Sequence, residues 1–266
     1  MRKIGYLIAA AVLLFPPVAR AQQETVDVGD DVRGRLSVEV DKKLARGLHV
    51  FAEGELRAYD NFSTFKRYAG TLGMSYKVNS YLKTGISYTF FNQVNNDGEW
   101  VPRHRMNVDL IGSLRPGLWH ISLRERVQIT NKTGYLNPYQ EVRNLVALRS
   151  RLKVSYNGFV RFEPYAFVEI RTLLNDPRCS AMYVTSTGAY SDYKFLGYND
   201  IYMNRVRSAL GMEWKLSRQH AFDFFLFGDW CREKDIDTNK EGTKLKSLTW
   251  EKGFNTTLGV SYKFSF

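Results

Sequence analysis

The sequence contains little cysteine and histidine, and it has no long apolar run beyond its N-terminal segment. Two cysteines and four histidines occur among 266 residues. Two cysteines are too few for a metal or multi-disulfide framework, and the histidines are too scattered for zinc-ligand spacing. No run of roughly eighteen apolar residues follows the first 21 positions, which excludes a transmembrane helix from the rest of the chain.

Motifs that hold cofactors or activate nucleophiles are also missing. The chain has no glycine-rich phosphate loop and no serine nucleophile elbow. We therefore expect no metal and no cofactor. The net charge of +11 is high enough to suggest nucleic acid or a membrane as partner. The N-terminal segment decides between them.

The first 21 residues have the organisation of a secretory signal peptide. Arg2 and Lys3 precede an apolar run over residues 4–15, and Ala19-Arg20-Ala21 forms a small-x-small cleavage site. We expect cleavage after Ala21, which leaves residues 22–266 exported and argues against nucleic acid. An uncleaved anchor is the alternative, although twelve residues are too few to span a bilayer comfortably.

The last thirteen residues alternate between apolar or aromatic and small or polar side chains. One face carries Phe254, Thr256, Leu258, Val260, Tyr262, Phe264 and Phe266. The other face carries Asn255, Thr257, Gly259, Ser261, Lys263 and Ser265. Strands of soluble proteins usually have about five or six residues, whereas a tilted strand crossing a bilayer needs about nine to eleven. The tail therefore predicts the closing strand of an outer-membrane β-barrel.

The same period-two pattern recurs along the chain. It is found at residues 36–40, 48–58, 68–78, 82–90, 106–110, 119–129, 142–156, 160–170, 202–216 and 222–230. Short turns alternate with longer loops, of which 173–200 and 232–253 are the longest. Both ends of a bacterial barrel normally lie in the periplasm, which requires an even number of strands. We predict an all-β, transmembrane, antiparallel up-and-down β-barrel of about 12 strands, with 10 to 14 as alternatives and a weak first strand within residues 24–32.

The polar face of the predicted strands, which points into the barrel, is rich in charged residues. Its bases are Arg57, Arg67, Arg105, Arg124, Arg126, Arg149, Arg151, Arg161, Arg171, Arg205 and Arg207. Its acids are Glu53, Glu55, Asp109, Glu163, Glu169, Glu213, Asp223 and Asp229. Glu125 breaks the pattern, which requires either a bulge or a position near the membrane interface. The charges fill the lumen with ion pairs, or they line a narrow channel that selects anions.

Two smaller features carry alternatives. His120 and Ser122 share one strand face, as in the His-x-Ser pair of outer-membrane lipases, but Leu123-Arg124 does not continue that motif and the lumen is the wrong place for lipid chemistry. We therefore expect no catalytic activity. Cys179 and Cys231 both fall at the external side, where an exported protein permits a disulfide, with two separate thiols as the alternative.

Several segments carry a family resemblance. They are Arg35–Leu44, Glu53–Arg57, Leu72–Val78, Arg103–Arg105, Leu123–Arg126 and Asn204–Arg207. In these the chain is similar to uncharacterised outer-membrane β-barrels grouped as a "domain of unknown function" and common in Bacteroidota. The resemblance implies the fold and the outer-membrane location, and it transfers no catalytic residue. The segment 173–200 is longer than the connections usual in that family, so a role specific to this loop is open.

The expected protein is a barrel domain over residues 22–266 in the outer membrane of a Gram-negative cell. Its expected partners are outer-membrane lipid and, for insertion, periplasmic chaperones and the barrel-assembly machinery, and it is expected to be monomeric. The favoured function is passive: a structural barrel displaying its loops, or a narrow arginine-lined channel. The alternatives are a porin for acidic oligosaccharides or other anions, and a lipid hydrolase using His120 and Ser122.

Overall fold

The computed structural model describes residues 24–95, 98–186 and 188–266, so the expected signal peptide lies outside the described residues. Twelve strands occur: β1 (Glu24–Asp27), β2 (Asp31–Ala45), β3 (Leu48–Tyr59), β4 (Thr64–Lys77), β5 (Leu82–Val94), β6 (Trp100–Leu114), β7 (Trp119–Lys132), β8 (Asn144–Tyr156), β9 (Phe162–Val184), β10 (Ala189–Lys215), β11 (His220–Thr238) and β12 (Leu245–Ser265). The predicted all-β fold is confirmed. The described part of the chain holds no helix with the length and apolar character needed to cross a membrane.

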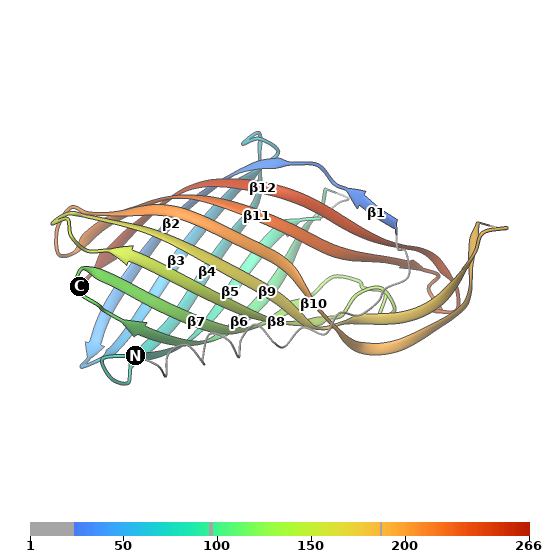
Figure 1. Cartoon of the computed structure of the whole chain (residues 1–266), viewed down its shortest axis with the longest axis horizontal. Coiled ribbons are helices and arrows are strands. Elements are labelled where there is room, and N and C mark those ends of the chain that lie inside the picture. Colours follow the sequence, from blue (N-terminus) through green and yellow to red (C-terminus); the bar gives the residue numbers. More distant parts are fainter. Residues whose placement is uncertain (1–23, 96–97, 187) are drawn as a thin grey trace.

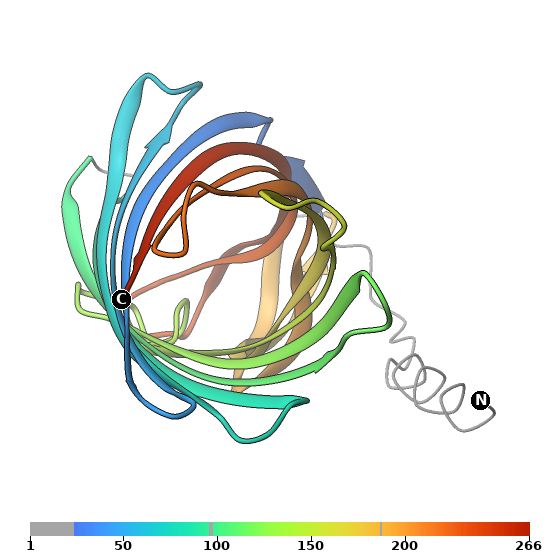
Figure 2. The same cartoon turned by 90° about the vertical axis from the view of Figure 1, so that its left-hand side faces the viewer.

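Strands β2 to β12 close into a ring, each antiparallel to the next, and β12 then pairs with β2 in parallel (Figure 2). The short β1 also pairs in parallel with β12, from Thr249 to Lys252, while β2 pairs with the following stretch of β12 from Asn255 onward. The two N-terminal strands therefore lie in line along one edge of β12. Twelve strands are present, as expected, but only eleven form the ring.

The expectation of an even ring is wrong because nothing reverses the chain between β1 and β2. Gly29, at a φ of +82°, only interrupts the pairing, and its N–H is accepted by Asp27 Oδ1 at 3.1 Å. First and last ring strands consequently run in the same direction. Phe266 ends beside the end of β2, where its N–H is accepted by the carbonyl of Asp41 at 3.0 Å. The described chain thus enters at one end of the barrel and finishes at the other.

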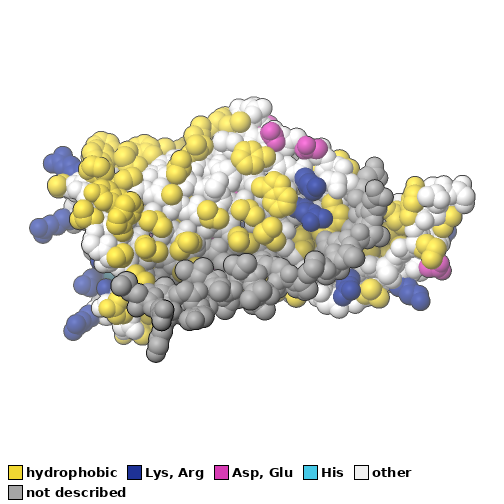
Figure 3. Space-filling view, viewed as in Figure 1, with side chains coloured by type: hydrophobic (Ala, Val, Ile, Leu, Met, Phe, Trp, Pro, Cys, Tyr) yellow, Lys and Arg dark blue, Asp and Glu magenta, His cyan; other side chains and the backbone are white. Residues whose placement is uncertain are grey.

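Side chains alternate between the two faces of the ring, except at a register shift between β3 and β4, where Phe65 is exposed although Arg67 points inward. Outward positions carry exposed apolar side chains, for example Leu72 (65% exposed) and Leu210 (64%), and these cover the outside of the barrel (Figure 3). One outward row runs through directly paired residues of five strands: Met212, Phe224, Val260, Leu36 and Leu56. The row crosses the parallel β12–β2 junction without a break, so the apolar exterior is continuous around the closure.

The two longest predicted loops are instead strands, which corrects the sequence analysis. β9 continues to Val184 and β10 begins at Ala189, so residues 173–200 contain only a short turn. The segment 232–253 is likewise formed by the ends of β11 and β12. β9 loses its partner β8 beyond Leu173, and β10 loses β11 before Arg205. Two hairpins therefore project beyond the ring, which Figure 1 shows on its right.

These external hairpins, residues 174–204 and 232–252, pack against each other through apolar side chains. Ile236, Leu245 and Leu248 form a buried cluster against which Cys179 and Tyr193 pack. At the base, Lys234 Nζ lies 3.2 Å from Asp176 Oδ2 and 2.6 Å from Asp200 Oδ2, which ties the hairpins electrostatically. Burial raises the pKa of the Asp176 carboxyl, an effect that the Lys234 charge opposes.

The connection 133–143 braces both hairpins. The Gln140 side-chain amide donates to Asp237 Oδ1 at 2.9 Å on one hairpin, and Tyr198 of the other donates its hydroxyl to the carbonyl of Pro138 at 2.7 Å. The Tyr139 and Phe195 rings meet edge to face with centroids 5.5 Å apart. Together these contacts make the external part a packed unit and not a set of loose loops.

The two cysteines are free thiols in this structure. On β10, the strand between them, the residue paired with Cys179 is Phe195 and the residue paired with Cys231 is Arg205, ten positions further along. Register shifts shorten this stretch of β10, and β9 covers it with the eight positions from Arg171 to Cys179; at about 3.3 Å per residue that is roughly 25 Å, far beyond the ~7 Å between Cα atoms that a disulfide can bridge. The disulfide alternative is therefore wrong, although both residues lie in the half of the molecule that carries the hairpins.

Glycines inside the barrel make room for aromatic rings. A Cβ on Gly259 would lie 2.1 Å from the ring of Phe225, and one on Gly211 would lie 2.3 Å from the ring of Tyr165. Phe225 cannot move aside freely, because it stacks on Phe227 with centroids 4.3 Å apart. These close approaches explain why an inward aromatic residue on one strand lies opposite an inward glycine on the next.

We predict that Gly259→Ala lowers the free energy of unfolding by about 1–3 kcal/mol, because the added methyl displaces a stacked, buried ring. The matched control is Gly54→Ala, since nothing lies within 4 Å of a Cβ at that strand position. Urea titration of the protein in phospholipid vesicles, followed by tryptophan fluorescence, measures both variants. Equal midpoints for the two would contradict the packing role of Gly259.

Candidate functional site: the charged lumen

The inward faces of the strands carry most of the charged residues that the sequence analysis placed there. Glu55, Arg67, Glu169, Arg207 and Asp229 are buried, and most of the others are partly buried. Arg161 is the exception, because β9 begins at Phe162 and leaves Arg161 exposed in the preceding turn. Arg161 therefore does not face the lumen, although its position fits the alternating pattern of the sequence.

Glu169 on β9 is the centre of the largest ion-pair cluster. Its carboxylate accepts from Arg124 Nη2 at 2.6 Å and from Arg151 Nε at 2.8 Å, and it also receives Arg149. Three guanidinium groups from β7 and β8 thus share one carboxylate that is 3% exposed. Charge-assisted bonds of this kind are the strongest available in a protein, and they join three neighbouring strands across the lumen face.

Glu55 on β3 is the centre of a second cluster. Arg57 Nε lies 2.8 Å and Arg35 Nε 2.7 Å from its carboxylate oxygens, and Arg67 Nε lies 3.8 Å away. Arg35 also reaches Glu53 at 3.1 Å. This cluster joins β2, β3 and β4 next to the closure of the ring.

Two further pairs are bidentate. Arg126 donates through Nε and Nη2 to Asp109 at 2.6 and 2.8 Å, and Arg207 donates in the same way to Asp229 at 2.7 and 2.8 Å. The remaining predicted acids bind other partners. Lys215 lies 2.6 Å from Glu163 and 3.8 Å from Glu213, while Asp223 accepts from the Tyr165 hydroxyl at 3.0 Å.

Even so, the lumen holds more arginines than these carboxylates pair. Arg126, Arg149, Arg171 and Arg205, which we call the arginine row, are directly paired positions on β7, β8, β9 and β10. Like charges opposite one another on neighbouring strands destabilise a sheet. Four arginines in register therefore require compensation, and Asp109 and Glu169 supply it only to Arg126 and Arg149.

Aromatic residues that were not predicted from the sequence share the lumen face with the charges. Tyr165, Phe167, Phe225 and Phe227 form a buried cluster on β9 and β11. Cationic groups lie over these rings, with Arg151 Cζ 4.2 Å from the Phe167 centroid and Lys153 Nζ 3.7 Å from that of Tyr165. The available signal was that β11 is aromatic on both faces, so one set had to point inward.

Phe91 is a further inward aromatic residue, and it is almost fully buried at 1% exposure. The guanidinium carbons of Arg67 and Arg105 lie 4.2 and 4.6 Å from its ring centroid. The ring therefore positions two arginines of β4 and β6 by cation–π contact.

His120 and Ser122 lie on the lumen face near the short-turn end of β7, opposite Ser155 and Lys153 of β8. Among the residues that the structure describes, no hydrogen bond joins His120 to Ser122. The described segments also contain no group of three or more His, Cys, Asp or Glu side chains that could hold a metal ion.

Glu125 points outward, between Leu110 of β6 and Ser150 of β8. The pairing of β7 with both neighbours is continuous, so no bulge re-aims this side chain. Its carboxylate accepts from the Ser150 hydroxyl at 2.6 Å. Glu125 is thus a carboxylate on the apolar face, halfway along its strand.

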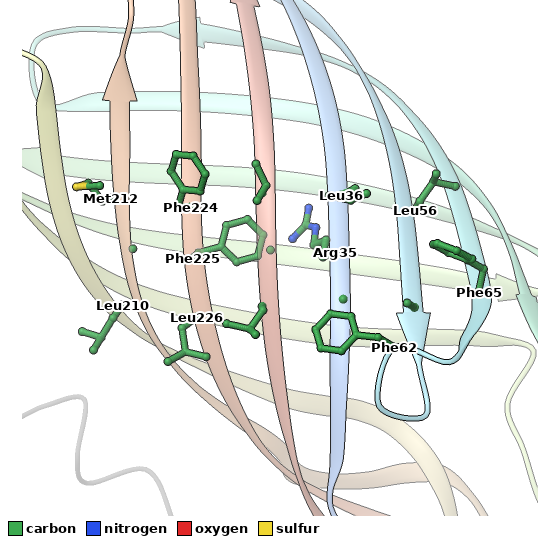
Figure 4. A pocket seen from close by; sticks show the side chains of 16 residues that line it. Arg35, Leu36, Leu56, Phe62, Phe65, Leu210, Met212, Phe224, Phe225 and Leu226 are labelled. Carbon is green, nitrogen blue, oxygen red and sulfur yellow. The ribbon is translucent and has the colours of Figure 1, made fainter.

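The apolar exterior has a groove of about 750 Å³ where β10, β11, β12, β2 and β3 adjoin. Figure 4 shows Met212, Phe224, Leu36 and Leu56 along it, with Phe62 and Leu226 nearer one end. Gly34, which shares the outward face of β2 with Leu36, contributes no side chain to the groove. The lining suits apolar chains and offers no chemistry.

The comparisons with known proteins assign no activity to this chain. A sequence model of the family described as "Protein of unknown function (DUF2490)" matches residues 36–240. No curated protein is similar enough to match this chain. Among solved structures, the chain is similar to the "Translocator domain of autotransporter NalP from Neisseria meningitidis", at 12% identity over 70% of each chain and a TM-score of 0.37.

Proposed function

The chain belongs to the DUF2490 family of proteins of unknown function, and we propose that it is an outer-membrane β-barrel without catalytic activity whose lumen is a narrow, arginine-lined passage for anions. The observation that carries the proposal is the surplus of guanidinium groups over carboxylates on the lumen face, concentrated in the arginine row. Rings of basic side chains select anions in pores.

The exterior supports a membrane location. Large apolar patches on a protein surface mark contact with lipid or another protein, and here they encircle the ring. Aromatic residues gather toward its ends, as in the girdles of outer-membrane barrels. Trp119 contacts Tyr156 at the short-turn end, with centroids 5.0 Å apart, and Tyr68 contacts Trp100 toward the other end at 5.4 Å.

The alternation of short turns with longer connections supports the orientation, with the hairpins outside the cell and the short turns in the periplasm. Insertion would use periplasmic chaperones and the barrel-assembly machinery. Because the apolar exterior is satisfied by lipid alone, we propose a monomer. Cross-linking in native outer membranes that yields a defined oligomer would contradict this part of the proposal.

Planar-bilayer recording tests the passage. We expect small currents whose reversal potential in a KCl gradient shows preference for chloride. A protein that is shown to be folded but gives no current above leak would remove the channel. A preference for potassium would contradict the role of the arginines.

The packed external hairpins support display of a surface as a second function, because buried clusters such as Ile236, Leu245 and Leu248 make them a defined shape. Shortening both hairpins, by deleting residues 177–197 and 234–250, tests the division of roles. If the protein is a channel, the shortened variant keeps the anion preference of the unaltered protein. If display is the function, the unaltered protein already gives no conductance.

The absence of catalysis is also part of the proposal. His120 and Ser122 are the only pair that the sequence offers for lipid hydrolysis, and they face the lumen near the periplasmic turns. We expect Ser122→Ala to leave the hydrolysis of phospholipid vesicles at the level of vesicles alone. Hydrolysis by the unaltered protein that disappears in this variant would establish the enzyme instead.

Glu125 gives a test of the lipid-facing surface. We predict that Glu125→Leu raises the free energy of unfolding in vesicles by less than about 2 kcal/mol. A carboxylate on the lipid face destabilises the folded barrel, although by less than a basic residue does. Leu110→Glu, directly opposite on β6, should lower the free energy of unfolding by a larger amount, because it adds a second lipid-facing carboxylate and places two like charges opposite one another. Urea midpoints measure both. A loss of stability in Glu125→Leu would show that the Ser150 hydrogen bond outweighs the cost of the charge.

A further inference from the structure

Several lumen arginines have no acidic partner, and three of them lie among arginines that are paired. In the described part of the chain, Arg105, Arg171 and Arg205 form no ion pair within 4 Å, whereas nearby Arg126, Arg149 and Arg207 each pair with a carboxylate. The buried Nε atoms of Arg171 and Arg205 also have no hydrogen-bond partner. Charged donors removed from water without partners are costly, so this part of the lumen is incomplete as it stands.

Two of the three residues lie on neighbouring strands, and the third lies on β6, three strands from β9 in the ring. Arg171 and Arg205 are directly paired on β9 and β10, and Arg149 of β8 is the next residue of the same row. Arg105 on β6 is within electrostatic range of Arg149 and Arg171, and Arg205 is within range of Arg57 on β3. Guanidinium groups of β6, β9 and β10 that have no direct carboxylate partner therefore share this part of the lumen with Arg149 and Arg57, which are paired with Glu169 and Glu55.

The polar groups around this region do not neutralise it. Arg105 Nε donates to Thr130 Oγ1 at 3.3 Å, and Asn204, with its amide turned to satisfy both atoms, accepts from Arg171 Nη1 at 3.1 Å. Glu233 acts on Arg171 and Arg205 only at longer range, and Asp229, which acts on Arg205, is already held by Arg207. Hydroxyl and amide groups orient the guanidinium groups, and no carboxylate of the described residues lies within ion-pair distance of Arg105, Arg171 or Arg205.

We propose that this region is a binding site for a polyvalent oxyanion, held by Arg105, Arg171 and Arg205. The inference rests on the proposed passage, which brings solutes into the lumen. The planar fork of a guanidinium matches the paired oxygens of phosphate or carboxylate, whereas chloride uses only one donor direction. Three such forks favour a ligand with at least two negative charges, such as a phosphate ester or a polycarboxylate.

Phe91 adds to the preorganisation of the site. Its buried ring makes cation–π contacts with both Arg105 and Arg67. The contact with Arg105 fixes the direction of its guanidinium group before the ligand binds. A fixed donor costs less to order on binding than a free side chain does.

The test compares anions at equal ionic strength, with inorganic pyrophosphate and citrate as probes and chloride as reference. We expect pyrophosphate to reduce the chloride current saturably in planar bilayers and to raise the unfolding temperature of the detergent-solubilised protein. Comparison with citrate distinguishes a phosphate site from a carboxylate site. No effect of either probe beyond that of chloride overturns the site.

Variants assign the effect to these residues. Arg171→Gln combined with Arg205→Gln should raise the half-blocking pyrophosphate concentration at least tenfold, and the corresponding double lysine variant should fall between it and the unaltered protein. Arg161→Gln, which removes an exposed arginine of a turn, should change nothing. An unchanged block in the double glutamine variant contradicts the assignment. If that variant does not fold, the lysine variant and the unaltered protein still decide the question.

The two proposals fail separately. An anion-selective current that pyrophosphate does not affect removes the site and leaves the passage. Stabilisation by pyrophosphate without any current removes the passage and leaves a closed barrel that binds an oxyanion.

Discussion

Replacing Glu169 by glutamine is expected to lower the free energy of unfolding by about 3–5 kcal/mol, the usual effect of removing one partner from a buried ion pair. The side chain keeps its shape and loses its charge. Arg124, Arg149 and Arg151 then face one another with no carboxylate between them. Their repulsion acts where solvent is nearly absent, since Glu169 is 3% exposed.

The matched control is Glu213→Gln. Glu213 lies on the same lumen face of β10, but its side chain is 37% exposed and its nearest cation, Lys215, is 3.8 Å away. Its loss should change stability by no more than about 1 kcal/mol, as for an exposed pair. Unfolding by urea in vesicles measures both variants. A Glu169→Gln protein as stable as the control would show that water reaches this cluster and screens it.

An all-or-none result is expected for the position of the N-terminal strand. In a background with Cys179 and Cys231 replaced by serine, Thr25→Cys should react with a membrane-impermeant maleimide on intact cells. Thr25 is exposed on β1 and pairs with Trp250, beyond the part of β12 that pairs with β2. The odd ring places this segment at the hairpin end, which we propose to be outside the cell.

Ser217→Cys is the control, because Ser217 lies in the exposed turn between β10 and β11 at the opposite end. It should react only after the outer membrane is permeabilised. A barrel closed by an antiparallel pair would give Thr25 the same behaviour as Ser217. Protection of Thr25→Cys in intact cells therefore overturns the parallel closure, and labelling of both variants in intact cells overturns the proposed orientation.

Much of the architecture was accessible from local pattern. The alternation in the tail predicted β12 because a strand has a side-chain period of two, whatever it pairs with. The same rule separated Leu258 from Thr257 and, on other strands, apolar from charged positions. It worked poorly where a residue fits the period but lies outside a strand, as Arg161 does. It also gave no sign that residues 173–200 are strand, since their side chains pack on a second hairpin and not on a continuous ring.

The sequence by itself determined the all-β character, the apolar and polar faces and the arginine-rich interior, because each follows from the types of neighbouring residues. The tertiary structure alone decided how the ring closes, which arginines share Glu169 and Glu55, and which remain without a carboxylate. Those outcomes depend on register between strands far apart in the chain. A shift of register would exchange every partner across a strand pair while leaving the sequence pattern of each strand intact.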